Sequence, residues 1–420
     1  TRPRSIYGYV KYPRTALEAT QPRNSACFLM LPTQSSGPGA FARLNLSRVP
    51  SPCFVVDEAK IRSNLKILAE IGKLSGAKVL LALKSFSMWS LASLIEEYLD
   101  GCCASGLWEA SLAREKGFTG IKKQKILSTF CPAFRSTELE EICELSDHLV
   151  FNHPQASGVK YAAAQQVSLG LRINPEISLG LDPKYDPCAE QSRLGWPISK
   201  LSESDLSPFE GLHFHTLCEQ NFAPLFQTWK KIENVLGSTL KKFSWINLGG
   251  GHHCTRSDYD QDGLIELIDE ISQKYDCQVY LEPGEAVSLD AGILVGEVID
   301  LMNSNAMHAL LDLSATCHTP DVIEAPYRPA LLGDIQDGKY PYFLGGSSCL
   351  TADSFGEYRM NNPLRIGDRV AFLDQAHYTM VKTNTFNGVK LPAIAIWNSQ
   401  TDNLSMVREF GYEEFVNRLS

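Results

Sequence analysis

The sequence lacks the features that define several large protein classes. No apolar run approaches the roughly 18 residues of a membrane-spanning helix, so no membrane span is predicted. The 39 Lys and Arg residues are outnumbered by 48 Asp and Glu residues, a formal net charge of −9. This balance argues against an extended basic face and therefore against nucleic acid as a partner.

The 12 cysteines include no Cys-x-x-Cys pair. Cys102 and Cys103 are adjacent, and the others are scattered, mostly through apolar segments. This pattern is typical of reduced, mostly buried thiols and not of a disulfide framework. We therefore expect a cytoplasmic protein. With 420 residues, 44% of them hydrophobic, the chain can form one large domain and a smaller one.

The first 48 residues differ in composition from the rest. They contain seven basic residues against one acid, several prolines and a Ser-Ser-Gly-Pro-Gly stretch at 35–39, with no sustained periodicity. We expect residues 1–48 to be a disordered or foreign extension. The same composition also permits an organelle transit peptide.

A regular alternation of helical and extended patterns begins at Asp57. Asp57 can cap a helix whose apolar residues Ile61, Leu65 and Leu68 share one face, and Gly76 lies just past its end. Eight short apolar runs follow, mostly separated by helix-like stretches: 79–83, 101–104, 125–128, 148–151, 167–173, 210–215, 243–248 and 278–281. Eight βα units in series predict an α/β fold with a parallel (β/α)8 TIM-like barrel over residues 49–290. A doubly wound open sheet is the competing architecture, but no Gly-x-Gly-x-x-Gly fingerprint follows the first run.

The pattern changes after about residue 290. Shorter strand-like segments, with Gly, Pro and Asp turns between them, occur at 293–299, 308–313, 342–344 and 370–373. They predict a C-terminal antiparallel β domain over residues 291–420. The chain just before Asp57 is expected to join this domain.

Reactive residue types follow the predicted barrel strands, where such barrels carry their chemistry. Lys84 closes the first run. Burial disfavours an ammonium group, and a neutral lysine amine is a nucleophile that forms Schiff bases. The alternative is a strand-end lysine that reaches out to water.

Three further groups occur at later strand ends. The glycines Gly249–Gly251 follow the seventh run and leave room for backbone N–H groups to surround an anion, although a tight loop also explains them. Glu282 could hold a proton on a heterocyclic nitrogen or pair with a nearby base. His213 and His215 share one face of the sixth run, and one of them could stack on a cofactor ring while the other is a core histidine.

Together these groups indicate one cofactor. Pyridoxal 5'-phosphate needs a lysine for its Schiff base, a phosphate cradle and an acid for its pyridine nitrogen. An imidazole can cover its ring. All four appear at strand ends of one predicted barrel.

The predicted β domain contributes two candidates. Cys349, between two glycines and Asp353, could donate a proton. Tyr378 could place its hydroxyl on the phosphate or the substrate. Ordinary structural roles remain open for both.

Two other functions compete with this hypothesis. In a metal-dependent hydrolase, His213 and His215 with the segment His252-His253-Cys254 could bind zinc, but no regular ligand spacing completes the set, so no metal is expected. A non-catalytic regulator would have no need of both Lys84 and Cys349.

The chain resembles the alanine-racemase-like (fold type III) pyridoxal-phosphate decarboxylases, which include diaminopimelate, ornithine and arginine decarboxylases. The resemblance covers roughly residues 50 to 415. The segments that carry it, with Cys349, are Leu81-Ala-Leu-Lys-Ser-Phe-Ser87, Gly211-Leu-His-Phe-His-Thr-Leu-Cys-Glu219, Asn247-Leu-Gly-Gly-Gly-His-His253, Leu281-Glu-Pro-Gly-Glu285, Leu311-Asp-Leu-Ser-Ala-Thr-Cys-His-Thr-Pro-Asp321 and Tyr327-Arg-Pro329.

The resemblance implies roles for these residues. Lys84 would carry the cofactor and His215 would stack on its ring. Glu282 would pair with the pyridine nitrogen, Gly249–Gly251 would hold the phosphate, and Tyr378 would contact phosphate or substrate. Cys349 of the partner subunit in a head-to-tail homodimer would protonate the decarboxylated carbon, so that a monomer has no complete active site.

The chain also departs from its relatives at two positions. Relatives acting on diaminopimelate or ornithine commonly have the motif Glu-Pro-Gly-Arg, whereas the last residue of this motif is Glu285 here. These relatives also often have an acid at the position of Leu350. Both changes suit a longer polyamine precursor as substrate, because an anion at position 285 favours amines. The candidate substrate-binding residues are Glu285, Asp321 and Asp353 for amines, and Arg328 for a carboxylate. Alternatively, these charges pair with one another and hold the β domain on the barrel.

Overall fold

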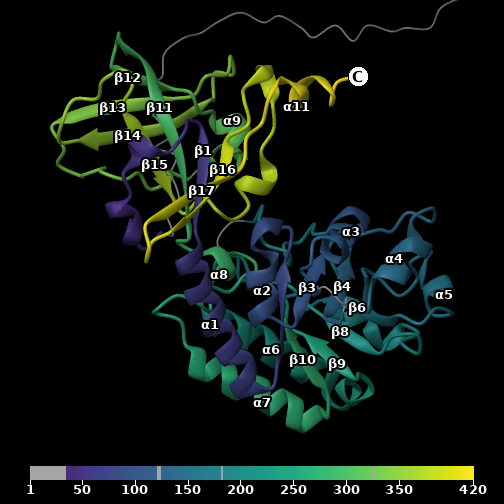
Figure 1. Cartoon of the computed structure of the whole chain (residues 1–420). Helices are drawn as coiled ribbons and strands as arrows, with labels where there is room; N and C mark the ends of the chain where they lie inside the picture. Colours follow the sequence, from purple (N-terminus) through teal and green to yellow (C-terminus); the bar gives the residue numbers. More distant parts are fainter. Residues whose placement is uncertain (1–34, 121–123, 181–182, 325–326) are drawn as a thin grey trace, which may run out of the picture.

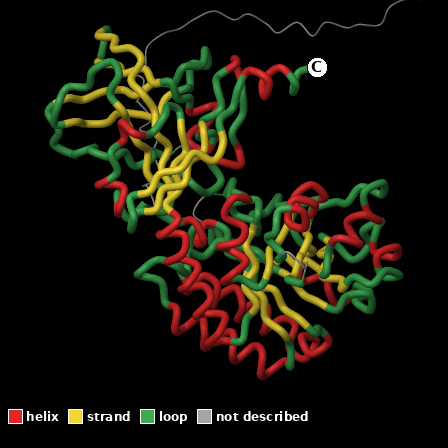
Figure 2. Tube along the Cα trace, in the orientation of Figure 1, coloured by secondary structure: helices red, strands yellow, loops and turns green. Residues whose placement is uncertain are grey.

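The computed structural model of the chain describes residues 35–120, 124–180, 183–324 and 327–420. These residues form two bodies, a barrel surrounded by helices and a separate β-sheet domain (Figure 1). Figure 2 shows the difference in composition, with helices around the strands of the lower body and mainly strands in the upper one.

Within the described residues, eight parallel strands close into a ring. Neighbouring strands pair in order, and β10 pairs with β2 to complete the circle. A short strand, β7 (Trp196–Pro197), lies outside the ring and pairs in parallel with the last residues of β6. The ring strands are β2 (Lys78–Ala82), β3 (Gly101–Ala104), β4 (Ile126–Phe130), β5 (His148–Phe151), β6 (Ser168–Asn174), β8 (Gly211–His213), β9 (Trp245–Asn247) and β10 (Gln278–Leu281). They confirm the eight predicted strands and the parallel barrel.

The first barrel helix, α1 (Glu58–Ser75), forms as its sequence predicts. Asp57 Oδ1 accepts the N–H of Ala59 at 3.0 Å, and Gly76 ends the helix at φ 73°. The apolar face of α1 is buried in the barrel core. The other barrel helices are α2 (Ala92–Tyr98), α3 (Leu107–Glu115), α4 (Leu139–Leu145), α5 (Val159–Ala162), α6 (Phe222–Leu236), α7 (Gln261–Tyr275) and α8 (Glu285–Ser288).

Aromatic side chains fill the amino-terminal end of the barrel. Trp245 stacks on His148 with ring centroids 4.5 Å apart, and Tyr280 meets His148 edge-on at 5.0 Å. Gly170 and Gly211 make room for the indole, because a Cβ on either would lie 2.3 or 1.9 Å from Trp245. This end of the barrel is packed, which leaves the carboxyl end for chemistry.

The second body is a sheet in the order β14-β13-β12-β11-β1-β16-β17, with β15 paired to β11. Its strands are β1 (Cys53–Asp57), β11 (Gly292–Asn303), β12 (Met307–Leu311), β13 (Tyr340–Gly345), β14 (Ser354–Met360), β15 (Arg369–Leu373), β16 (Ala393–Asn398) and β17 (Asn403–Arg408). The four predicted C-terminal strands are present. The sheet is mixed and not wholly antiparallel, because β1–β16 and β12–β13 are parallel pairs. A long connection separates the strands of each pair, as parallel pairing requires.

The remaining elements are short. The helices of the sheet domain are α9 (Ala315–His318), α10 (Asp321–Glu324) and α11 (Tyr412–Val416), and the 3-10 turns are η1 (Gly39–Arg43), η2 (Leu46–Arg48), η3 (Trp89–Leu91), η4 (Ile198–Glu203), η5 (Gly237–Lys242), η6 (Met380–Lys382) and η7 (Phe386–Gly388). Among the described residues, no helix is both long and apolar enough to cross a membrane.

Part of the expected extension belongs to the sheet domain. Residues 1–34, for which disorder or a foreign origin was predicted, lie outside the described residues. Phe41 is 3% exposed and packs on Trp397 with ring centroids 5.4 Å apart, and Leu44 is buried in the same cluster. The expected extension of residues 1–48 therefore reaches too far along the chain, because the apolar side chains of Phe41 and Leu44 cover the sheet and belong to its domain.

The segment after β15 returns from the sheet domain to the barrel. The N–H of Tyr378 donates to the carbonyl of Ser85 at 2.8 Å, and the N–H of Asp290 donates to Asp374 Oδ1 at 2.7 Å. These bonds place Tyr378 at the carboxyl end of the barrel, next to the turn that carries Lys84.

Candidate active site

A cavity of about 560 Å³ lies at the carboxyl end of the barrel. Side chains that follow five different ring strands line it, together with one residue of the sheet domain. Six predicted site residues share its wall: Lys84, His215, Gly251, Glu282, Glu285 and Tyr378.

Lys84 lies in a turn and not at the end of a buried strand. Strand β2 ends at Ala82, whose carbonyl accepts the N–H of Ser85 at 3.1 Å. The Lys84 side chain is exposed along the cavity wall. The expectation of burial was wrong, and the consequence is an amine that a carbonyl compound in the cavity can reach.

Glu282 is buried at the end of β10 and holds two partners. Its Oε2 lies 3.1 Å from His213 Nε2, and its Oε1 accepts a hydrogen bond from Asn247 Nδ2 at 2.8 Å. Burial alone would raise the pKa of Glu282, but His213, Asn247 and Lys84 outweigh it and lower that pKa. Glu282 is therefore an ionised acceptor in the cavity wall that can hold a further proton donor.

The two predicted histidines of the β8 segment take different positions. His215 lines the cavity, and its Nδ1 accepts the N–H of Gly250 at 2.9 Å. Burial and then Lys84 hold the pKa of His215 well below its usual range. This neutral ring is fixed in orientation and suited to cover a flat ligand, whereas His213 is buried beneath Glu282.

The glycine run is a tight loop whose amides are partly committed. Gly249 and Gly251 have φ of 70° and 81°, and a Cβ on Gly250 would lie 2.0 Å from the carbonyl oxygen of Glu282. The N–H of Gly249 donates to Asn247 Oδ1 at 2.8 Å, and that of Gly250 donates to His215. Glycine is required here by both backbone conformation and close packing.

Only part of the predicted phosphate cradle is therefore free for an anion. Of the three amides, that of Gly251 alone has no acceptor within the described residues. The N–H of Gly284, which also lines the cavity, has none there either. An anion at this loop would therefore meet the amides of Gly251 and Gly284, and not all three amides of the glycine run.

A chain of histidines and carboxylates continues the wall behind Glu285. His253 Nε2 lies 2.6 Å from Glu285 Oε2, and His377 Nδ1 lies 3.6 Å from Glu285 Oε1. His377 Nε2 is 3.2 Å from Asp374 Oδ2. Burial would lower the pKa of His377, but Asp374 and Glu285 raise it to about 10. His377 is thus a cation at neutral pH, and Glu285 is not a free carboxylate.

His377 and Asp374 could not be assigned to the site from the sequence, because Glu285, which joins this pair to the cavity wall, lies far away along the chain. Arg172, near the end of β6, is a further residue of the site that was not predicted. It is buried in the cavity wall, donates from Nη2 to the carbonyl of His215 at 3.0 Å, and lies 4.5 Å above the Phe130 ring. Burial lowers the pKa of Arg172 to about 10, partly opposed by Glu282.

Two predicted substrate residues are engaged elsewhere. Arg328 Nη2 binds Asp334 Oδ2 at 2.6 Å, and its guanidinium lies 3.9 Å from the centroid of the Tyr358 ring. Asp353 is buried and accepts hydrogen bonds from the hydroxyl of Ser314 and from three backbone amides. Neither residue lines the cavity. These contacts organise the sheet domain, and the geometry of the cavity gives neither substrate assignment any support.

Asp321 also has a partner. It contacts Lys382, which binds Glu324 at 2.9 Å as well. Burial raises the pKa of Asp321, and Lys382 opposes that shift. Asp321 lies near Tyr185, which lines the cavity. The pKa of Tyr185 is raised mainly by burial and secondly by the charge of Asp321. Asp321 itself does not line the cavity.

Cys349 is exposed in the loop between β13 and β14. Its N–H donates to Asn387 Oδ1 at 2.8 Å, and it does not line the cavity of its own chain. Two apolar side chains beside it are open to solvent, Leu350 at 42% and Phe386 at 45%.

The histidines considered for zinc have other partners. His213 faces Glu282, and His252 Nδ1 lies 2.8 Å from the hydroxyl of Tyr259. In the described part of the chain, no three His, Cys, Asp or Glu side chains converge as a metal site.

The closed barrel, the adjoining sheet, and a lysine, a ring-covering histidine and a buried carboxylate in one cavity define a pyridoxal-phosphate enzyme. Residues 53–376 match a family model described as pyridoxal-dependent decarboxylase, C-terminal sheet domain. The chain belongs to this family, and pyridoxal phosphate is its cofactor.

Two curated relatives and one solved structure are similar over most of the chain. Carboxynorspermidine/carboxyspermidine decarboxylase of Campylobacter jejuni is 40% identical over 88% of this chain and 99% of its own length. Carboxyaminopropylagmatine decarboxylase of Synechocystis is also 40% identical, over 89% of this chain and 96% of its own. The crystal structure of carboxynorspermidine decarboxylase from Campylobacter jejuni, complexed with norspermidine, has a TM-score of 0.80 and covers 88% of this chain and 100% of that one.

Proposed function

We propose that this enzyme decarboxylates carboxynorspermidine or carboxyspermidine to norspermidine or spermidine, a step of polyamine biosynthesis. The observation that carries the proposal is the 40% identity, along nearly the full length, to a relative named for these substrates. The solved relative holds norspermidine, the product of one of the two reactions. We expect the reaction to run in the cytoplasm, where free thiols persist.

A second substrate is favoured by a specific observation. The Synechocystis relative has the same 40% identity to this chain as the Campylobacter jejuni relative, and it is named for carboxyaminopropylagmatine. All three compounds are carboxylated and carry amines beyond the reacting carbon. The diaminopimelate alternative is weakened by Glu285, because an anion in the wall disfavours a second carboxylate.

The residues of the cavity have separable tasks in this proposal. The bound cofactor supplies an electron sink for the pair left when CO2 departs. Lys84 holds the cofactor covalently and His215 covers its ring. Glu282 keeps a proton on the pyridine nitrogen, since it remains ionised between His213 and Asn247. Gly251 and Gly284 offer amides, and Tyr378 a hydroxyl, to the phosphate.

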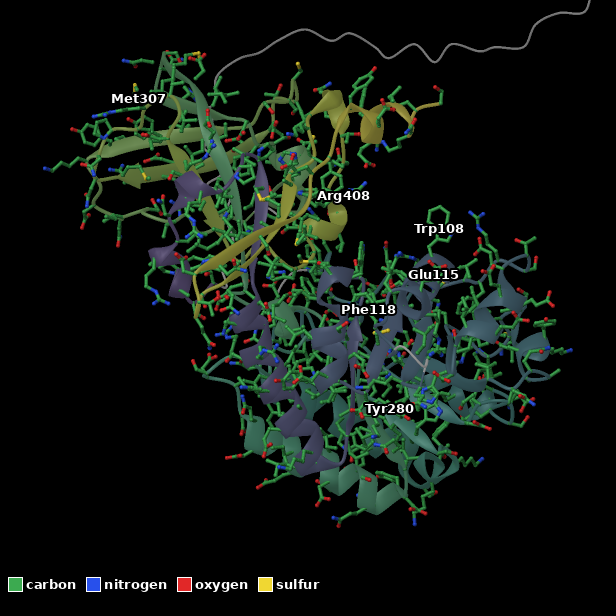
Figure 3. The ribbon with its side chains drawn as sticks, viewed as in Figure 1. Trp108, Glu115, Phe118, Tyr280, Met307 and Arg408 are labelled. Carbon is green, nitrogen blue, oxygen red and sulfur yellow. The ribbon has the colours of Figure 1, made fainter. Side chains whose placement is uncertain are left out.

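The proton for the decarboxylated carbon is proposed to come from Cys349 of a partner subunit. The thiol lies outside its own chain's cavity and beside the exposed Leu350 and Phe386. The barrel also carries an exposed aromatic side chain. Trp108, which projects from the barrel beside the carboxyl end of β3 (Figure 3), is 88% exposed. A head-to-tail homodimer would cover these exposed side chains and bring each thiol to the other subunit's cavity.

Substrate selection is proposed to rest on the acidic side of the cavity. Glu285 remains the candidate for favouring substrate amines, through its charge and not as a free hydrogen-bond partner, since His253 holds it. Asp321 with Lys382 stands at the edge. Arg328 and Asp353 have no part in this selection.

The decisive experiment measures CO2 release from carboxynorspermidine, carboxyspermidine, carboxyaminopropylagmatine, diaminopimelate, ornithine and arginine. We expect kcat/KM for a carboxylated polyamine to exceed that for each basic amino acid by two orders of magnitude or more, as roughly 3 kcal/mol of added contacts would give. Equal or higher kcat/KM with diaminopimelate would overturn the proposal.

A further inference from the structure

Glu219 belongs to a segment that wraps around the glycine loop. The N–H of Gln220 donates to the carbonyl of Gly251 at 3.1 Å, and the N–H of His253 donates to the carbonyl of Gln220 at 3.0 Å. A Cβ on Gly251 would lie 1.9 Å from the carbonyl oxygen of Leu217. Glu219 itself has φ 54°. Its position is therefore tied to the loop that offers an amide to the cofactor phosphate.

The carboxyl group of Glu219 has no partner of its own. Within the described ranges, no donor hydrogen-bonds to it and no cation pairs with it. His253, almost completely buried, has an Nδ1 that is also unpartnered. The titratable groups around Glu219 are Cys218, His253, Glu285, Tyr327, Asp374, His377 and Tyr378. They belong to both domains, and Cys218, His253, Glu285 and Tyr378 line the cavity.

A phosphate ester at the glycine loop meets an electrostatic obstacle here. It brings close to two negative charges at neutral pH into a cavity lined by Glu285, which interacts with two further carboxyl groups, Glu219 and Asp374, outside the lining. His377 is the cation among them. Like charges in a partly buried wall repel strongly. The phosphate is held best if one of the three carboxyl groups is neutral.

We propose that Glu219 is a positioning residue for the cofactor, which takes up a proton from solvent as the phosphate enters. The dianion then enters a cavity whose surrounding carboxyl groups carry one negative charge fewer. The proposal concerns cofactor binding alone and does not depend on which polyamine precursor is decarboxylated.

Glu219 is the carboxyl group of the three that can change its charge. Glu285 is held ionised by His253 at 2.6 Å, and Asp374 by His377 at 3.2 Å. Burial and then Glu285 raise the pKa of Glu219 to about 7. Phosphate would raise it further. Below a pH of about 7, Glu219 already carries its proton before the cofactor binds. Above that pH, a proton must be taken up together with the cofactor, so the affinity for the cofactor should fall as pH rises.

The test compares wild type with Glu219→Gln, which keeps the size of the side chain but cannot ionise. Cofactor is removed, and the protein is titrated with pyridoxal phosphate at pH 6 and pH 8 by calorimetry in buffers of different ionisation enthalpy. At pH 8 the variant should take up nearly one proton fewer than wild type and bind the cofactor about tenfold more tightly. At pH 6 the two proteins should match. Comparing the two proteins cancels titrations that they share.

Two controls isolate the phosphate and the residue. Glu203→Gln, at an exposed position at the end of η4, should behave as wild type. Pyridoxal, which lacks the phosphate, should show no difference between wild type and Glu219→Gln. A further measurement uses the wild-type protein alone. Its infrared difference spectrum at pH 8 should show a newly protonated carboxyl group when pyridoxal phosphate is added, and should not show it when pyridoxal is added.

Equal proton uptake by wild type and Glu219→Gln at pH 8 would overturn the proposal. So would the absence of the protonated-carboxyl band in wild type, a result that does not depend on the variant folding. Unchanged cofactor binding together with weaker binding of norspermidine would instead make Glu219 an amine-reading residue and would also reject the proposal. Failure to decarboxylate the proposed substrates would leave it intact.

Discussion

His377 of the sheet domain faces Glu285 of the barrel, with Nδ1 3.6 Å from Oε1. The next residue, Tyr378, has φ 44° and donates its amide to Ser85, immediately after Lys84. The ion pair therefore joins the two domains at the wall of the cavity that Lys84 and Tyr378 both line.

The first prediction concerns the covalent anchor of the cofactor. Borohydride reduction of the holoenzyme should leave the pyridoxyl group on Lys84, which peptide mass analysis would locate. Lys84→Ala should lose nearly all turnover, whereas Lys78→Ala, which removes a pair with Asp100 at the far end of β2, should retain it. A label on any other lysine would refute the assignment.

The second prediction concerns the proton donor. Cys349→Ala should keep the visible absorbance of bound cofactor but lose most turnover. Mixing it with Lys84→Ala subunits should restore activity, because some hybrid dimers contain one intact site. Cys131→Ala removes a thiol outside the main cavity and should neither lose activity nor complement. Subunit exchange without recovery would place Cys349 outside a shared site.

The third prediction concerns the acidic wall. Glu285→Gln removes a charge that favours amines, so KM for a carboxylated triamine should rise more than KM for a diamine-length substrate. Because Glu285 acts through its charge and not through a direct hydrogen bond to the substrate, the loss should be on the order of 1 kcal/mol. Steady-state kinetics on substrates of both lengths measure the effect. An unchanged preference would show that Glu285 serves only to hold His253 and His377.

The fourth prediction concerns the pH dependence of stability. The folded-state pKa of His377 is about 10, above the value of about 6.5 expected in the unfolded chain. His377 therefore contributes stability that is fully present below pH 6.5 and is lost as pH rises through 10, on the order of a few kcal/mol. Denaturant unfolding should show a steeper loss over this window in wild type than in His377→Gln. If the unfolding free energies of wild type and His377→Gln changed with pH in the same way, His377 would not stabilise the contact between the two domains.

Much of the fold could be predicted from the sequence because its signals are local. Each barrel strand is a short apolar run, and the carboxyl ends of parallel strands meet at one end of the barrel. That geometry brings Lys84, His215, Gly251 and Glu282 to one cavity, as the sequence analysis expected. Their roles in binding and catalysis await the experiments above.

What could not be predicted depends on partners that are distant along the chain. Arg328 and Asp353 were expected to meet substrate, but Asp334 and the backbone amides around Ser314 hold them. A charged residue type does not reveal which group will neutralise it. Phe41 was missed because an apolar residue in a stretch rich in proline and glycine has no periodic context, although it packs on Trp397.

The position of β1 has a consequence for how the chain is made. This strand precedes the barrel, yet it lies between β11 and β16, which follow it. During synthesis, β1 emerges first and has no strand to pair with until the whole barrel has been translated. An apolar, unpaired strand is prone to aggregate, so newly made chains should depend on chaperones or on rapid folding of the barrel. The sheet domain, unlike the barrel, is not a contiguous part of the gene, so a single segment expressed alone cannot retain all of its strands.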